Sequence, residues 1–357
     1  MSQYAPVVVP VKPAPVAMAV VGAGLIGRRH IEHITAEPEA ALAAIVDPAP
    51  EAKALAAKLN VPWFPDFASL IAKSKPDGVI VATPTQAHAA NGLEAIAAGI
   101  PALVEKPIAD DVASATRLVE AAGKARVPLL IGHHRRYNPM IARARDIIAS
   151  GRLGRIVAVH ASFWLMKPDD YFDIPWRRQV GAGPILTNLI HDVDLLRHLV
   201  GEVAAVQAIT SNAIRGNAIE ETAVILLRFA NGALGTVTIS DSIVAPWSWE
   251  QTTGENPAYP MTDQSCYQIG GTHGSLNLPK LDVWTNPDKR SWWEPFEVQR
   301  TYPVAQDPLR LQIRNFARVI RGTAAPLVTG RDGLETLRVI DAIQRAASSG
   351  QQVVISQ

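Results

Sequence analysis

Apolar residues in the first third of the chain come in short unbroken runs, each followed by a segment with helical spacing. The runs lie at 19–21, 41–46, 78–82, 102–104 and 129–132, and the helical segments at 28–36, 50–59, 67–73, 86–98 and 111–125. A short run without polar residues is typical of a strand buried on both faces. Strands that alternate with helices predict an α/β domain with a doubly wound parallel sheet over residues 17–133.

The pattern changes after residue 133. Strands with alternating polarity are predicted at 156–165, 203–211, 222–229 and 234–240, and helices at 139–150, 309–320 and 333–347. A run of strands with few helices indicates an α+β domain with an open, mostly antiparallel sheet, here residues 134–357. The two late helices are candidates to pack back on the first domain. Residues 245–263, rich in Pro, Gly, Thr and Trp, are expected to form a long ordered loop.

Composition and charge exclude several classes of protein. The formal net charge is +1, which gives no electrostatic footprint for nucleic acid. No apolar run approaches the roughly 18 residues of a membrane span. Residues 1–16 carry four prolines and no cationic start, so we expect an extended tail and not a signal peptide. The single cysteine, Cys266, fits a reducing compartment, and a cytoplasmic protein is expected.

Three glycines follow the first buried run with the spacing G-x-G-x-x-G. They are Gly22, Gly24 and Gly27, and a helix is predicted to begin directly after them. In this pattern the first glycine permits a tight turn, the second lets a pyrophosphate approach the backbone, and the third lets helix and strand pack closely. An ordinary turn between strand and helix is the alternative, but the next strand favours a dinucleotide site.

That next strand ends in Asp47, where a carboxylate meets the adenosine ribose hydroxyls of a bound dinucleotide. Asp47 would repel a 2′-phosphate, and Pro48 and Ala49 supply no cation to hold one. The sequence therefore predicts NAD as the cofactor in preference to NADP.

Lys106 stands between Glu105 and Pro107 at the end of another predicted strand. A lysine that is partly desolvated and lies near a cationic nicotinamide has a lowered pKa and can exchange protons. The alternative is a surface lysine paired with Glu105.

Residues 181–199 are the second segment with candidate chemistry. A glycine-rich loop and Pro184 begin a predicted helix that Gly201 ends, and its apolar residues form one stripe at helical spacing. The polar face carries Thr187, His191, Asp194 and His198, with Asn188 beside them. His191 is a candidate general base because imidazole titrates near neutrality. The alternatives are a solvated polar face or, less favoured, a metal site; we predict no metal.

Four motifs in this order resemble the Gfo/Idh/MocA family over nearly the whole chain. They are the GAGLIG loop at 22–27, the segment Ala82–His88, Glu105-Lys106-Pro107, and the helix around His191-Asp192-Val193-Asp194. The resemblance implies a Rossmann domain, then a second domain whose open sheet forms a homodimer or homotetramer interface. It also implies hydride transfer between a nicotinamide and a secondary alcohol of a sugar or cyclitol.

Carried over by position, the resemblance makes Lys106 and His191 the catalytic residues. Cofactor contacts are expected in the glycine loop and near the carboxyl ends of the predicted strands, at Gly22, Gly24, Leu25, Ile26, Gly27, Asp47, Thr83, Pro84, His88, Glu105 and Lys106. The family often has Asp four residues before the histidine, where this chain has Thr187, which cannot hold a negative charge. We expect His191 to accept the hydroxyl proton while Lys106 stabilises the alkoxide.

Further substrate contacts are expected from the strand end after 132 and from an aromatic-rich segment. With Lys106 and His191, the predicted substrate residues are Arg135, Trp176, Thr187 and Asn188. The small substrate is a polyhydroxylated ring. Two alternatives stay open: a cis-dihydrodiol dehydrogenase of aromatic degradation, and a nucleotide-binding sensor without turnover. The joint presence of Lys106 and His191 argues for an enzyme.

Overall fold

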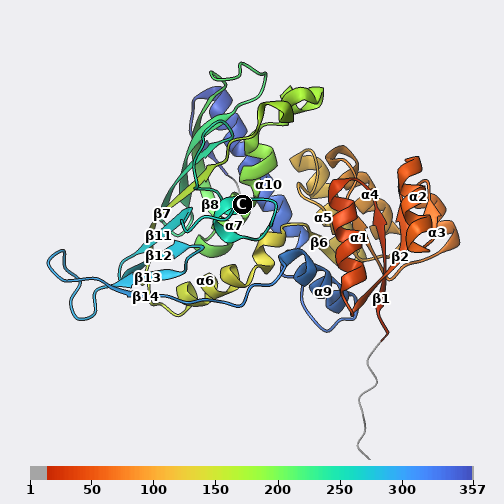
Figure 1. The fold of residues 1–357 in the computed structure, drawn as a ribbon, viewed down its shortest axis with the longest axis horizontal. Coiled ribbons are helices and arrows are strands. Elements are labelled where there is room, and N and C mark those ends of the chain that lie inside the picture. The colour runs from red at the N-terminus through yellow and green to blue at the C-terminus, as the bar shows by residue number, and fades with distance from the viewer. Residues whose placement is uncertain (1–13, 356–357) are drawn as a thin grey trace, which may run out of the picture.

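The computed structural model describes residues 14–355, in which two sheets form the framework (Figure 1). The expected tail at 1–16 lies almost wholly outside the described residues, and Val16 already belongs to the first strand. The first sheet has the order β3-β2-β1-β4-β5-β6, and its strands pair in parallel. Its strands are β1 Val16–Val21, β2 Ala40–Val46, β3 Trp63–Phe64, β4 Gly78–Val81, β5 Ala102–Val104 and β6 Leu129–Ile131.

Helices connect these strands in the way the alternating pattern predicts. They are α1 Leu25–Ala36, α2 Pro50–Leu59, α3 Phe67–Lys73, α4 Thr85–Ala97 and α5 Val112–Ala125. Every residue of β4, β5 and β6 is buried, which is why their sequences read as unbroken apolar runs. The strand order reverses between β1 and β4, which is the point where open α/β sheets bind their ligands.

The second sheet has nine strands in the order β14-β13-β12-β11-β7-β10-β9-β8-β15. Its strands are β7 Ile156–Trp164, β8 Val203–Ser211, β9 Thr222–Phe229, β10 Leu234–Ser240, β11 Tyr267–Gly271, β12 Gly274–Leu278, β13 Asp282–Thr285, β14 Glu297–Gln299 and β15 Val353–Val354. The pairing is antiparallel except that β7 and β10 pair in parallel. The mostly antiparallel expectation is confirmed.

Strands β11 to β14 are not anticipated by the sequence. They have three to five residues each, and glycine occupies positions 270, 271 and 274. Such short strands show too few alternations for a period of two to be detected. The expected loop at 245–263 is also partly wrong, since it contains helix α8, Trp249–Thr253, capped by the Ser248 side chain.

The late helices α9, Pro308–Ile320, and α10, Gly330–Ser349, lie against the first sheet. Ile313 and Phe316 of α9 are fully buried in the cluster that contains β1 and β4 residues. Leu337 of α10 joins the other cluster of the first sheet, whereas Ile340 and Ile343 belong to the core of the second. Helix α10 therefore packs on both sheets.

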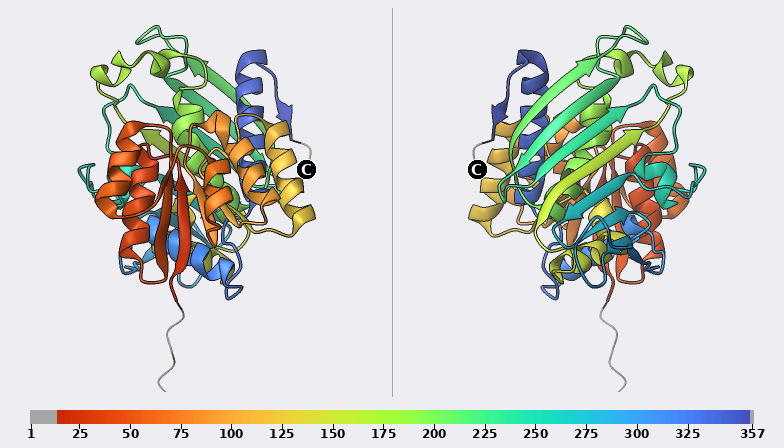
Figure 2. Two further views of the ribbon diagram at one scale, coloured as in Figure 1. Left: turned by 90° about the vertical axis from the view of Figure 1, so that its right-hand side faces the viewer. Right: turned by 90° about the vertical axis from the view of Figure 1, so that its left-hand side faces the viewer.

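One face of the second sheet is not covered by helices. In the right-hand view of Figure 2 its strands face the viewer, with helices behind or beside them. Val224, Leu226 and Leu234 on this face are 47 %, 49 % and 59 % exposed. Within residues 14–355, no helix has the length and apolar character needed to cross a bilayer.

Candidate active site

The glycine loop between β1 and α1 approaches the neighbouring backbone too closely for side chains. Gly22 has φ +93°, and a Cβ there would lie 2.6 Å from the Ala82 carbonyl group. A Cβ on Gly27 would lie 2.0 Å from the Gly22 oxygen, so the third glycine lets α1 pack on the loop. A Cβ on Gly24 would meet nothing within 4 Å. Gly24 thus leaves open space beside the N-terminus of α1, as a pyrophosphate requires.

Asp47 ties the ends of β1 and β2 together. Its carboxylate accepts hydrogen bonds from the backbone N–H groups of Ala23, at 2.7 Å, and Ala49, at 2.8 Å. The carboxylate is therefore held at the edge of the sheet, beside the glycine loop.

A cavity of about 1100 Å³ opens at this carboxyl edge. Most of the predicted cofactor residues line it: Gly22, Gly24, Leu25, Ile26, Asp47, Thr83, Pro84, His88, Glu105 and Lys106. Gly27 lies behind the loop and is not part of the lining. Of the predicted substrate residues, Lys106, Trp176 and His191 line the same cavity, whereas Arg135, Thr187 and Asn188 do not.

Lys106 follows β5 and contacts the segment before His191. Its Nζ donates a 3.1 Å hydrogen bond to the backbone oxygen of Thr187. Burial lowers the pKa of Lys106 to about 8, although the nearby Glu105 carboxylate acts in the opposite direction. A group with this pKa exchanges protons readily near neutrality.

Glu105 stays ionised beneath Lys106. Its carboxylate accepts a 2.7 Å hydrogen bond from Nε2 of the fully buried His30. Burial acts to raise the pKa of Glu105, but the hydrogen bond and charge of His30 and the charge of Lys106 outweigh it and lower the value to about 2. Glu105 therefore provides a fixed negative charge next to the amine.

His88 connects two loops of the cavity wall. Its ring nitrogens lie 2.7 Å from the Pro107 oxygen and 2.8 Å from the Thr83 oxygen. The side chain of Thr83 donates to Asn91 at 3.1 Å. The predicted contacts of His88 and Thr83 with a cofactor stay predictions, but both residues shape the loops that a cofactor would touch.

His191 reaches the cavity from the second domain. Its residue is 7 % exposed, and its Nδ1 is buried without a hydrogen-bond partner among the described residues. Burial lowers the pKa of His191 well below the ordinary value, and the positive charges of Lys106 and Arg135 lower it further. The imidazole is consequently neutral at physiological pH and has a lone pair to accept a proton.

The segment before His191 differs from the single helix predicted from 184. Residues Ile185–Leu189 form a π-helical turn, and α7 spans Ile190–Val200. Thr187 belongs to this π turn and does not line the cavity that His191 lines. The Thr187 hydroxyl instead donates to Gly183 and to Asn188, at 3.0 Å each.

The alternative of a solvated polar face is wrong for this helix. Ten of the eleven residues of α7 are buried, including the charged Asp192, Asp194 and Arg197. Asp194 accepts from Arg136 at 2.7 Å, and His198 lies against Arg145. Within the described residues no group of His, Cys, Asp and Glu is arranged to hold a metal ion.

Arg135, a predicted substrate residue, forms ion pairs inside the protein. It belongs to the 3₁₀ helix η1, His134–Tyr137, and is 3 % exposed. Its guanidinium pairs with Asp192 at 3.2 Å and with Glu250 of α8 at 2.7 Å. A substrate contact of Arg135 stays a prediction, but both terminal nitrogens of its guanidinium already contact carboxylates of the protein.

Trp176 lies in the 3₁₀ helix η3, Pro175–Arg178, and is 55 % exposed where it lines the cavity. Other aromatic residues of this region are core, since Phe163 and Phe172 are 1 % and 6 % exposed. Trp176 therefore offers a flat apolar surface at the cavity edge, suited to the C–H face of a ring.

His134 lines the cavity although it is not among the site residues predicted from the sequence. The preceding residue, His133, is 1 % exposed and outside the cavity lining, whereas His134 is part of that lining. The His134 ring lies 5.2 Å from the His191 ring between centroids. Its Nε2 pairs with Glu255 at 3.0 Å. The sequence does contain a feature that could have predicted His134 as a site residue, namely two consecutive histidines directly after a predicted strand.

Comparisons with protein families agree with this geometry. Residues 16–133 match the model described as "Oxidoreductase family, NAD-binding Rossmann fold", and residues 141–277 match the model described as "GFO/IDH/MocA C-terminal domain".

Individual proteins are similar over most of the chain. A 1,5-anhydro-D-fructose reductase of Ensifer adhaerens is 29 % identical over 80 % of this chain and 82 % of its own. An inositol 2-dehydrogenase of Rhizobium meliloti is 27 % identical over 96 % and 99 %. The crystal structure of the WlbA dehydrogenase from Bordetella pertussis, in complex with NADH and UDP-GlcNAcA, is 27 % identical, with a TM-score of 0.78 over 96 % and 99 % of the two chains.

Proposed function

The chain belongs to the Gfo/Idh/MocA family of oxidoreductases and is an NAD-dependent dehydrogenase, and we propose that it oxidises a secondary alcohol of a sugar or cyclitol at Lys106 and His191. One observation carries the proposal: Lys106 from the first sheet and His191 from α7 line the cavity that also contains the glycine loop. The relatives named for an anhydrosugar and for inositol support a polyhydroxylated ring as the substrate.

The residues present fit NAD. Gly24 leaves open space at the N-terminus of α1, where backbone N–H groups favour a pyrophosphate. Asp47 is fixed by two backbone N–H groups at the position for a ribose, and its charge disfavours a 2′-phosphate. When bound, NAD supplies the acceptor for the hydride.

The protein's part in the reaction is to bind the alcohol and manage its proton. Burial and nearby cations lower the pKa of His191, so its imidazole is neutral and has a lone pair with which it accepts the hydroxyl proton. The Lys106 ammonium stabilises the negative charge that develops on the oxygen. Help of this kind is worth roughly a hundred- to ten-thousand-fold in rate.

We also propose the division of labour between domains: residues 17–133 hold the cofactor, and residues 134–357 hold the substrate and form the oligomer interface. The uncovered face of the second sheet, with Leu226 and Leu234 exposed, supports a homodimer or homotetramer.

The test of the function is NADH formation from NAD with a panel of ring substrates. The panel contains myo-inositol with NAD, 1,5-anhydro-D-fructose with NADH, and UDP-GlcNAcA with NAD. Each pair is assayed with the unaltered enzyme and with the Lys106→Ala and His191→Ala variants. Oxidation or reduction of at least one member, lost in both variants, supports the proposal. Turnover that survives in His191→Ala would show that the reacting centre lies elsewhere.

A further inference from the structure

His134 and His191 lie edge to face in the cavity, at an interplanar angle of 71°. The two rings differ in their access to solvent. The side chain of His134 is 21 % exposed, whereas the whole of His191 is 7 % exposed. A proton removed from a substrate in this cavity thus reaches solvent more easily from His134 than from His191.

His191 is poorly suited to keep a proton. No described carboxylate bonds to its ring, and its neighbours include Lys106 and Arg135. The same surroundings that keep the imidazole neutral make its protonated form unstable. A proton taken from an alcohol must therefore move on before the next turnover.

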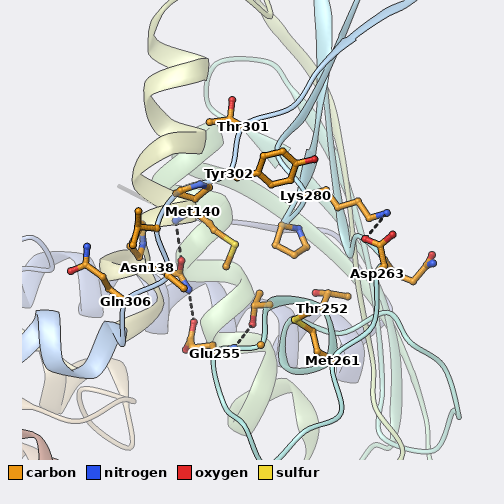
Figure 3. A pocket seen from close by; sticks show the side chains of 18 of the residues that line it. Asn138, Met140, Thr252, Glu255, Met261, Asp263, Lys280, Thr301, Tyr302 and Gln306 are labelled. Atoms are coloured by element: carbon orange, nitrogen blue, oxygen red, sulfur yellow. Dashed lines mark hydrogen bonds and ion pairs between the residues drawn. The ribbon is translucent and has the colours of Figure 1, made fainter.

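His134 is supported by a carboxylate, in contrast to His191. Glu255 Oε1 pairs with His134 Nε2, while Glu255 Oε2 accepts from Asn138 Nδ2 at 2.9 Å and from Trp249 Nε1 at 3.0 Å. Figure 3 shows the hydrogen bond between Asn138 and Glu255 in a second cavity, of about 820 Å³, which both residues line. Donors from three sides therefore fix this carboxylate.

Glu255 remains charged in this position. Burial acts to raise the pKa of Glu255, but the hydrogen bond and charge of His134, the charge of Arg135 and the hydrogen bond of Asn138 lower it to about 2. Because an ionised carboxylate only accepts, the neutral form of His134 has its proton on Nε2 and a lone pair on Nδ1. Nδ1 makes no hydrogen bond to the described residues.

The other charged groups around His134 are fixed. Glu105 is ionised above a pKa of about 2, and Arg135 is paired with Asp192 and Glu250. Lys106 and the two neighbouring histidines, 133 and 191, add positive or titratable groups on the cavity side. Glu255 is the carboxylate that contacts the His134 ring directly.

We propose that His134, held by Glu255, is a proton-relay residue for the dehydrogenase, an inference that rests on the proposed function. The O–H bond of the alcohol breaks as His191 takes the proton, and the C–H electron pair leaves as hydride to NAD. The proton on His191 then passes to the ring of His134, whose centroid lies 5.2 Å away, and the resulting imidazolium, which faces the Glu255 carboxylate, releases it to solvent. His191 returns to its neutral form.

The test compares His134→Asn and Glu255→Gln in the full-length enzyme, with His198→Asn as the matched control. His198 lies on the same helix as His191 but against Arg145. We measure kcat and KM from pH 5 to 10, using myo-inositol or whichever panel member is turned over. In His134→Asn, kcat is expected to fall at least tenfold with KM little changed, and added imidazole is expected to restore it. In Glu255→Gln the acidic limb of the profile is expected to move to lower pH, because the imidazolium loses its anion.

A second readout does not depend on turnover. Histidine ring titrations followed by NMR in the NADH complex identify His134 by its absence from His134→Asn. Glu255→Gln is expected to move that titration to lower pH, whereas His198→Asn leaves it in place. If no panel member is turned over, the proposed function fails. The NMR titration still shows whether Glu255 stabilises the protonated form of His134.

Two results would overturn the relay. One is a kcat profile in His134→Asn that matches the unaltered enzyme, and the other is a low kcat that imidazole does not restore. Loss of NADH binding in both variants would equally count against it, since the pair would then be holding the fold.

Discussion

The amine of Lys106 is bonded to the backbone oxygen of Thr187, at 3.1 Å, and not to its side chain. The contact joins the residues after β5 of the first sheet to the π-helical turn before α7. Since the acceptor is a carbonyl group, the position of the amine does not depend on the residue type at 187.

Thr187→Ala is therefore expected to be mild. The backbone acceptor remains, and the loss of a neutral hydroxyl hydrogen bond costs about 0.5–1.5 kcal/mol, or roughly tenfold at most in kcat/KM. Lys106→Ala and His191→Ala are expected to cost roughly 3–5 kcal/mol each while NAD binding persists. Steady-state kinetics and calorimetric NAD titration measure both quantities. Equal damage from Thr187→Ala and His191→Ala would make position 187 a full catalytic member.

The lowered pKa of Lys106 predicts an alkaline limit to activity. Below a pKa of about 8 the ammonium stabilises the developing alkoxide, and above it the charge is lost, so kcat/KM should fall with a midpoint near pH 8. Lys106→Arg keeps its charge throughout and should move this limb above pH 10, at some cost in rate from the different geometry. The pH dependence of kcat/KM in both enzymes is the measurement. An alkaline limb that stays in place in Lys106→Arg would belong to another group.

Cofactor preference should depend on the charge of Asp47. NAD is expected to bind more tightly than NADP. Asp47→Asn should lower the ratio of the NADP to the NAD dissociation constant at least tenfold, which corresponds to about 1.4 kcal/mol of binding free energy. The amide keeps nearly the same shape but removes the repulsion of a 2′-phosphate. Calorimetry with both dinucleotides tests this. NADP binding as tight as that of NAD to the unaltered protein would contradict the assignment.

Assembly should fail when charge is placed on the uncovered sheet face. Leu226→Lys and Leu234→Lys are expected to shift the protein from dimer or tetramer towards monomer, because each puts an ammonium group into the apolar contact. Ile214→Lys, at an exposed residue outside the strands of this sheet, is the matched control. Light scattering at micromolar concentration gives the mass. A monodisperse monomer for the unaltered protein would exclude this interface.

The buried pair of Arg136 and Asp194 predicts a large loss of stability. Arg136→Met leaves the Asp194 carboxylate buried without its guanidinium partner, and breaking such a pair costs about 3–5 kcal/mol. Chemical denaturation followed by circular dichroism gives the free energy of unfolding. Arg338→Met, at a partly exposed pair within α10, should change it by less than about 1 kcal/mol. Similar losses of unfolding free energy in the two variants would show that burial of the pair of Arg136 and Asp194 does not determine its contribution to stability.

The sequence by itself determined the first domain and half of the candidate site. Apolar runs at β4, β5 and β6 are local consequences of burial on both faces, and the backbone of the glycine loop leaves no room for side chains at Gly22 and Gly27. Lys106 and Asp47 stand at strand ends, so a parallel sheet brings them to one edge. Each of these features leaves a pattern in the sequence that extends over only a few residues.

Tertiary structure alone decided the rest, because it concerns pairs far apart in the chain. Packing of η1 against α7 and the segment around α8 creates several ion pairs. They join Arg135 to Asp192 and Glu250, and His134 to Glu255. The buried charges of α7 form ion pairs with distant residues, and Thr187 hydrogen-bonds Gly183 and Asn188 and does not line the cavity. Local spacing cannot report which distant charge will neutralise a buried one, since only close packing brings the two together.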